Sequence, residues 1–122
     1  MNNSVTVIAP KTDNDGRTID QLAYINKLTD AAGGCTVKPA QGYWIDEKDN
    51  KLYKDSNNLL ESSFLLKDLN KVAQASAEIV KSLMIDGGQF QVSVITSTNG
   101  LTIYEQSDTV QEIAKNIISE FN

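Results

Sequence analysis

The sequence contains no histidine, and cysteine and arginine occur once each, as Cys35 and Arg17. The absence of imidazole excludes a Ser-His-Asp triad and histidine zinc ligands, and one cysteine can form neither an intramolecular disulfide nor a multi-cysteine zinc site. The longest apolar runs are three or four residues, far short of the roughly 20 that cross a bilayer. No basic and then apolar segment opens the chain. We therefore expect a cytoplasmic protein without a membrane partner.

Basic residues are also scarce, because eleven Lys and Arg stand against sixteen Asp and Glu, for a net charge of -5. This balance disfavours direct nucleic-acid binding, which uses clustered basic side chains. An acidic mimic of nucleic acid remains an alternative to ordinary solubility. It requires most of five carboxylates on one exposed face: Asp46, Glu47, Asp49, Asp55 and Glu61.

The N-terminal half of the chain predicts one strand, one helix and a long hairpin. Residues 4–9 are rich in β-branched side chains and end at Pro10, which predicts a strand. Thr18 and Gln21 have the spacing of a capping box, so we expect a helix from Thr18 until Gly33 stops it. Residues 35–64 alternate as β structure around a charged turn at residues 49–50, with an irregularity expected near Pro39.

The C-terminal half predicts two helices and a second hairpin. Apolar residues recur at helical spacing over residues 66–84, and a strand pattern follows at residues 90–96. Asn99-Gly100 predicts a type I′ turn into a strand at residues 101–104. Asp108 and Gln111 suggest a capping box for a last helix over residues 110–121.

The predicted order is therefore βαββαββα, in one domain over residues 1–122. The first six elements match a ferredoxin-like split βαβ arrangement, an antiparallel sheet with helices on one face. A hairpin strand and a helix are added at the C-terminus. The fold class is α+β.

The aromatic residues of the long hairpin are the most informative candidates for a binding site. Tyr43 or Trp44 can lie opposite Tyr53 and form a platform that stacks a base or another ring. Alternatively, Trp44 fills the core or an interface between subunits. Asp46 lies beside this cluster in the sequence, and Arg17 belongs to a polar loop after the first strand, where a ligand could also be held.

The remaining reactive groups favour structural roles. The run Asp13-Asn14-Asp15-Gly16 lacks the glutamate that closes an EF-hand loop, so we expect a solvated loop and no metal site. Asp46 and Glu61 could approach across the hairpin, but nothing in the sequence places them in a pocket. Cys35 has no histidine to activate it and reads as a small buried side chain. The sequence therefore predicts no catalytic residue and no cofactor.

One stretch resembles a known family. Gly34-Cys35-Thr36, Gly42-Tyr43-Trp44 and Lys51-Leu52-Tyr53 resemble the G-x-T and G-x-W hairpin, after a first helix, of an uncharacterised bacterial family of small domains. The resemblance covers roughly residues 5–98. It implies the fold but no reaction, since no activity is established for that family.

Two functional hypotheses follow. The first is a non-enzymatic inhibitor or adaptor, of the kind that a phage or another mobile element encodes. It is expected to be a homodimer joined through sheet faces or edges, because helices on one face leave the other uncovered. The second is a small-molecule-binding protein or enzyme, with a pocket on the concave sheet face of a dimeric α/β barrel. That pocket would be lined by Tyr43, Trp44, Tyr53 and Asp46.

Overall fold

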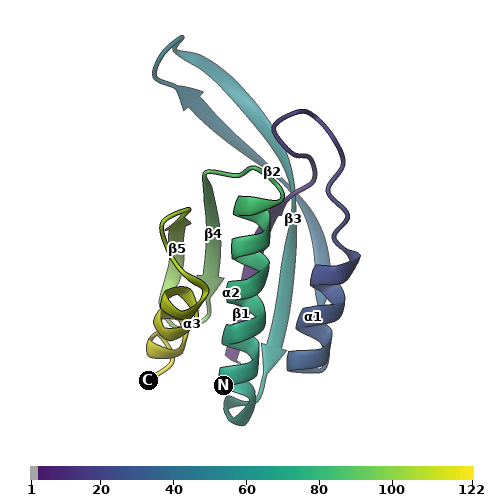
Figure 1. Ribbon diagram of the computed structural model, residues 1–122, viewed down its shortest axis with the longest axis vertical. Helices are drawn as coiled ribbons and strands as arrows, with labels where there is room; N and C mark the ends of the chain where they lie inside the picture. The colour runs from purple at the N-terminus through teal and green to yellow at the C-terminus, as the bar shows by residue number, and fades with distance from the viewer. Residues whose placement is uncertain (1–2) are drawn as a thin grey trace.

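The computed structural model describes residues 3–122, which form a five-stranded antiparallel sheet and three α-helices (Figure 1). The strands are β1 (Asn3–Pro10), β2 (Thr36–Asp46), β3 (Lys51–Phe64), β4 (Gln91–Thr96) and β5 (Gly100–Glu105). The helices are α1 (Leu22–Ala32), α2 (Leu69–Ile85) and α3 (Val110–Ser119), with a 3₁₀ turn, η1, at Leu66–Asp68. The sheet order is β2-β3-β1-β4-β5. The α+β class is as predicted.

All three helices lie on one face of the sheet (Figure 1). Strand residues alternate between the two faces, and on β1 Val5, Val7 and Ala9 point toward the helices and are fully buried. Helix α2 supplies the centre of the core with Ile79 and Leu83, also fully buried. Within residues 3–122 no helix has the length and apolar character needed to span a bilayer.

The β2–β3 hairpin is much longer than the body of the sheet. Its pairing runs without interruption from Thr36 opposite Glu61 to Asp46 opposite Lys51. The irregularity expected near Pro39 is wrong, because Pro39 pairs in register with Asn58 on the edge strand β2. The far half of the hairpin extends beyond the helices (Figure 1). We call this part, residues 42–55, the arm.

Helix α1 begins later than predicted. It starts at Leu22, and its N-cap Gln21 makes no side-chain capping bond. The expected box of Thr18 and Gln21 is wrong because the Gln21 side chain turns inward, where its amide donates to the carbonyl oxygens of Ala9 and Pro10. The Gln21 side chain therefore bonds the carbonyl groups at the end of β1 and does not cap α1.

Two other turn predictions need correction. Positive φ occurs at Gly100 (80°) but not at Asn99, and Thr96 pairs with Gly100, so residues 97–99 form a three-residue connection and not a type I′ turn. The capping box of α3 is made by Thr109 and Glu112, one residue beyond the expected pair.

Two glycines, Gly87 and Gly88, set the backbone conformation of the loop between α2 and β4. A Cβ atom at Gly87 would lie 2.6 Å from the Leu83 carbonyl oxygen, and Gly88 has a φ of +66°. Both positions therefore exclude a larger residue without strain. This loop stands next to the end of β1, where the candidate site lies.

Candidate functional site

A polar pocket of about 270 Å³ lies where the arm leaves the body of the sheet. It is bounded by the end of β1, the loop from β1 to α1, the start of the arm in β3, and the loop before β4. Its lining residues are Pro10, Thr12, Asp13, Asn14, Lys54, Asp55, Ser56 and Gln89. We call this site the shoulder pocket.

The loop between β1 and α1 forms one wall of the pocket. It is held by hydrogen bonds within itself, to β3 and to the loop before β4. The Asp13 Oδ1 atom accepts the backbone amides of Asp15 and Arg17, each at 2.9 Å. Lys11 donates its backbone amide to the Ser56 carbonyl oxygen at 3.0 Å, and the Asn14 side-chain amide donates to the Gly88 carbonyl oxygen. The pocket is therefore preformed by hydrogen bonds.

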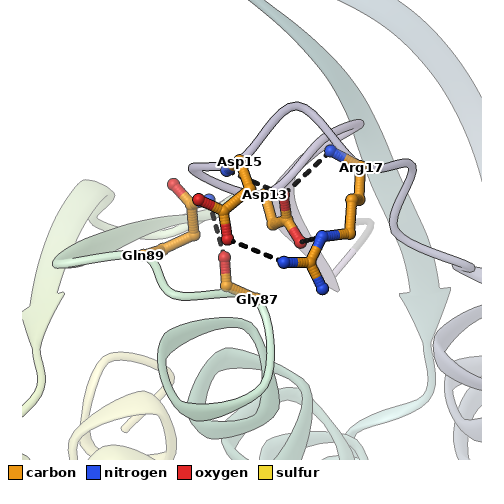
Figure 2. Close-up of polar contacts among 5 residues, drawn as sticks. All are labelled: Asp13, Asp15, Arg17, Gly87 and Gln89. Carbon is orange, nitrogen blue, oxygen red and sulfur yellow. Dashed lines mark hydrogen bonds and ion pairs between the residues drawn. The ribbon is translucent and has the colours of Figure 1, made fainter.

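Arg17 lies on this loop and not in the pocket lining. Its guanidinium donates to Asp15 Oδ2 at 3.0 Å, and Nε lies 4.0 Å from Asp13 Oδ2. Figure 2 shows this cluster above the backbone of Gly87 and Gln89. The Arg17 side chain is 76% exposed, so its charge can attract an anionic ligand from solvent, although its ion pairs contribute little to stability.

Two charged residues of the arm, Lys54 and Asp55, belong to the lining of the pocket. Lys54 and Asp55 are exposed, and neither forms a side-chain hydrogen bond or an ion pair with other residues in the range 3–122. The pocket thus carries the carboxylates of Asp13 and Asp55 and the ammonium of Lys54. The sequence indicates a possible ligand site at the loop that carries Asp13, but it does not place Lys54 and Asp55 there, because only the crossing of arm and loop brings the three residues together.

The predicted aromatic pair forms on the arm. Trp44 lies opposite Tyr53, and their rings stack with centroids 4.9 Å apart and planes at 22°. Trp44 is 46% exposed, which overturns the alternative that it fills the core. Tyr43 is opposite Lys54 and points to the other face of the hairpin. The structure therefore splits the proposed aromatic cluster in two, and its ligand role stays a prediction.

Asp46 lies at the tip of the arm. It pairs in register with Lys51, and its carboxylate accepts the Lys48 backbone amide at 2.9 Å. The Tyr53 hydroxyl donates to the nearby Asp49 carboxylate, and this bond raises the pKa of Tyr53. Glu61 lies ten residues from Lys51 along β3, which in a strand is about 33 Å. Asp46 and Glu61 therefore cannot act as a pair.

Cys35 lies in a second pocket, of about 330 Å³, at the other end of β2. Burial raises the pKa of its thiol, and a hydrogen bond with Ser62 opposes this rise. A protonated thiol is a poor nucleophile. Across residues 3–122, no three Asp, Glu or Cys side chains cluster so that they could hold a metal ion.

The shoulder pocket offers binding and charge placement. Hydroxyls of Thr12 and Ser56 and amides of Asn14 and Gln89 can donate and accept hydrogen bonds at one small ligand. Carboxylates on two walls favour positive charge, and Lys54 favours one negative group. This is the lining expected for a small zwitterionic or cationic molecule.

Comparison with known proteins gives one informative match. No family model matches the chain, and no curated protein matches its sequence. Among solved structures the fold is similar to that of a phage SAM lyase in complex with S-methyl-5'-thioadenosine, with a TM-score of 0.58. The match covers 85% of this chain and 89% of that chain at 13% identity.

This match corrects the prediction of a non-enzymatic inhibitor or adaptor. That prediction treated the fold as a binding module because the sequence lacks histidine and reactive cysteine. The same fold serves an enzyme over most of the chain's length.

Proposed function

We propose that this protein is a lyase that binds S-adenosylmethionine or a related adenosyl sulfonium and releases S-methyl-5'-thioadenosine. The observation that carries the proposal is the shared fold with a SAM lyase that holds this thioether, over 85% of the chain. The shoulder pocket supports it with suitable chemistry. At 13% identity, the assignment of residues below rests on the pocket of this chain alone.

The charges of the pocket complement those of the substrate. S-adenosylmethionine carries a sulfonium, an ammonium and a carboxylate. The pocket carries two carboxylates, at Asp13 and Asp55, and one ammonium, at Lys54. Its volume of about 270 Å³ is slightly below the roughly 300–1,000 Å³ of typical ligand pockets. We therefore assign the pocket to part of the substrate, with the rest reaching the open side.

The reaction explains how a chain without histidine could act. Cleavage breaks the bond between the sulfonium sulfur and the carbon chain of the amino-acid part. The electron pair of that bond stays on sulfur, which becomes a neutral thioether. A carboxylate oxygen of the same amino-acid part forms a new bond to the carbon that loses sulfur, so that this part leaves as a lactone. Neither water nor a redox partner enters. The task of the protein is to bind and orient the substrate in a reactive geometry.

The test is product formation. The protein is incubated with S-adenosylmethionine, and S-methyl-5'-thioadenosine is measured by liquid chromatography and mass spectrometry. We expect product in proportion to protein concentration. Absence of product above the protein-free rate, together with no binding of the thioether by calorimetry, would remove the proposal.

Paired variants locate the site. We expect Asp55→Asn and Lys54→Met to lower kcat/KM by about tenfold or more, since each removes a charge worth about 1.4 kcal/mol at the substrate. Asp30→Asn and Lys115→Met change net charge equally at exposed positions on α1 and α3. These controls should keep the full rate. Equal losses in all four variants would point to a general charge effect and not to this pocket.

We further propose that the elements from β1 to β4 form a ferredoxin-like unit. Support comes from the order β1-α1-β2-β3-α2-β4 along the chain and from helices on one face of an antiparallel sheet. The C-terminal β5 and α3 then extend this unit at the β4 edge. An experimental structure compared with ferredoxin-like domains tests this assignment.

A further inference from the structure

The arm exposes an unusual amount of apolar surface for its size. Five large side chains lie within 11 residues of sequence and are 38–67% exposed: Tyr43, Trp44, Ile45, Leu52 and Tyr53. They occupy both faces of the hairpin, with Ile45 opposite Leu52 on one face and Trp44 opposite Tyr53 on the other. Figure 1 shows that no helix of the described chain lies over this part.

A two-stranded hairpin alone is only marginally stable in water. Among residues 3–122 no third strand pairs with the arm, because β2 is the edge of the sheet and β1 pairs with β3 only as far as Asn57. The described part of one copy therefore leaves these apolar side chains exposed. Clusters of this kind mark interaction sites.

The accessible surface area of the chain indicates how much surface a partner would cover. The accessible surface is 7275 Å², whereas a compact monomer of this mass exposes about 6,500 Å². The excess of about 800 Å² equals the share of one partner in an interface of standard size. One protein-sized contact would thus restore the usual surface.

The charge of the arm favours another copy of the same chain as that partner. The arm carries three lysines, Lys48, Lys51 and Lys54, and four acids, Asp46, Glu47, Asp49 and Asp55, for a net charge of -1. The whole chain carries -5. Two copies therefore repel one another least at the arm, and its mixed signs can pair across a symmetric contact. A strongly basic or strongly acidic partner would meet no complementary net charge on the arm.

We propose that the arm is a self-association surface, on which a second copy of this chain buries Ile45, Leu52 and the Trp44–Tyr53 pair. The contact needs no ligand, so it stands or falls independently of the proposed lyase activity. It also gives the exposed aromatic residues a role in assembly.

Light scattering coupled to size-exclusion chromatography tests the proposal over a dilution series up to about 100 μM, a range that resolves micromolar dissociation constants. We expect a mass of at least twice the 13.4 kDa of one chain, and we expect this mass to fall on dilution. A monomer at every concentration would overturn the proposal and leave the arm to a different protein.

Two matched variants then locate the contact. Leu52→Asn alters the arm, and Leu65→Asn is its control, because Leu65 is nearly as exposed (64% against 67%) but lies after β3. We expect Leu52→Asn to weaken association by about tenfold or more, from the loss of one buried leucine. Leu65→Asn should match the unmodified chain. Equal effects of the two changes would overturn the assignment to the arm.

Fluorescence provides a readout that needs no substitution, because Trp44 is the only tryptophan. We expect its emission to shift to longer wavelength on dilution, at the concentration where the mass falls. Dissociation with no change in emission would show that the contact lies away from the Trp44–Tyr53 pair and would contradict the proposal.

Discussion

Gln21 connects three elements around the entry to the shoulder-pocket loop. Gln21 is buried, with 8% of the residue exposed. Its amide nitrogen donates to Pro10 at 2.8 Å and to Ala9 at 3.3 Å, and its oxygen accepts from the Asn58 amide at 2.8 Å. One residue thereby fixes the end of β1, the start of α1 and the middle of β3.

Replacement of Gln21 should cost stability. We expect Gln21→Leu to lower the free energy of unfolding by about 1–3 kcal/mol, because buried carbonyl and amide groups lose their partner. Urea denaturation measures the change. Gln111→Leu, at an exposed position on α3, is the control and should leave the midpoint in place. Equal unfolding midpoints for the two variants would show that the hydrogen bonds of Gln21 do not stabilise the fold.

Cys35 should react slowly with alkylating reagents. Burial raises the pKa of its thiol, and the Ser62 hydrogen bond lowers it less. The thiolate fraction, and hence the iodoacetamide rate, should therefore rise at a higher pH than for a free cysteine. Mass spectrometry of alkylation against pH measures this. A midpoint at or below that of free cysteine would contradict the burial.

The helices show which elements a sequence predicts well. The apolar spacing of residues 66–84 correctly predicts α2, because ten of its residues are buried against the sheet and the other helices. The ends are predicted less well. Capping depends on which polar side chain faces the first turn, and Asp108 instead accepts the Glu105 backbone amide, leaving Thr109 to cap α3.

The cap of α3 gives a prediction at this scale. Thr109 Oγ1 accepts the Glu112 amide at 3.1 Å, and the Glu112 carboxylate accepts the Thr109 amide. We expect Thr109→Ala to lower the free energy of unfolding by about 1 kcal/mol. Thr109→Ser keeps the accepting hydroxyl and should unfold close to the unmodified chain. Equal loss in both would mean that the methyl group and not the cap stabilises α3.

At the scale of the whole molecule, the class, the strands and the helices follow from local patterns, whereas the shoulder pocket does not. Asp13 and Asp55 lie 42 residues apart and meet only because the long hairpin passes the loop after β1. No local spacing encodes that crossing. The stacked pair Trp44 and Tyr53 was predictable, because the register of a hairpin follows from its turn.

The measurement that tests the central claim most directly is a titration of ¹⁵N-labelled protein with S-methyl-5'-thioadenosine, followed by backbone amide resonances. We expect saturable shifts concentrated at the walls of the shoulder pocket, at residues 12–14, 54–56 and Gln89. We also expect smaller shifts at Cys35 and its pocket at the far end of β2. Shifts centred on another surface, or none at millimolar ligand, would show that the shoulder pocket does not bind the thioether.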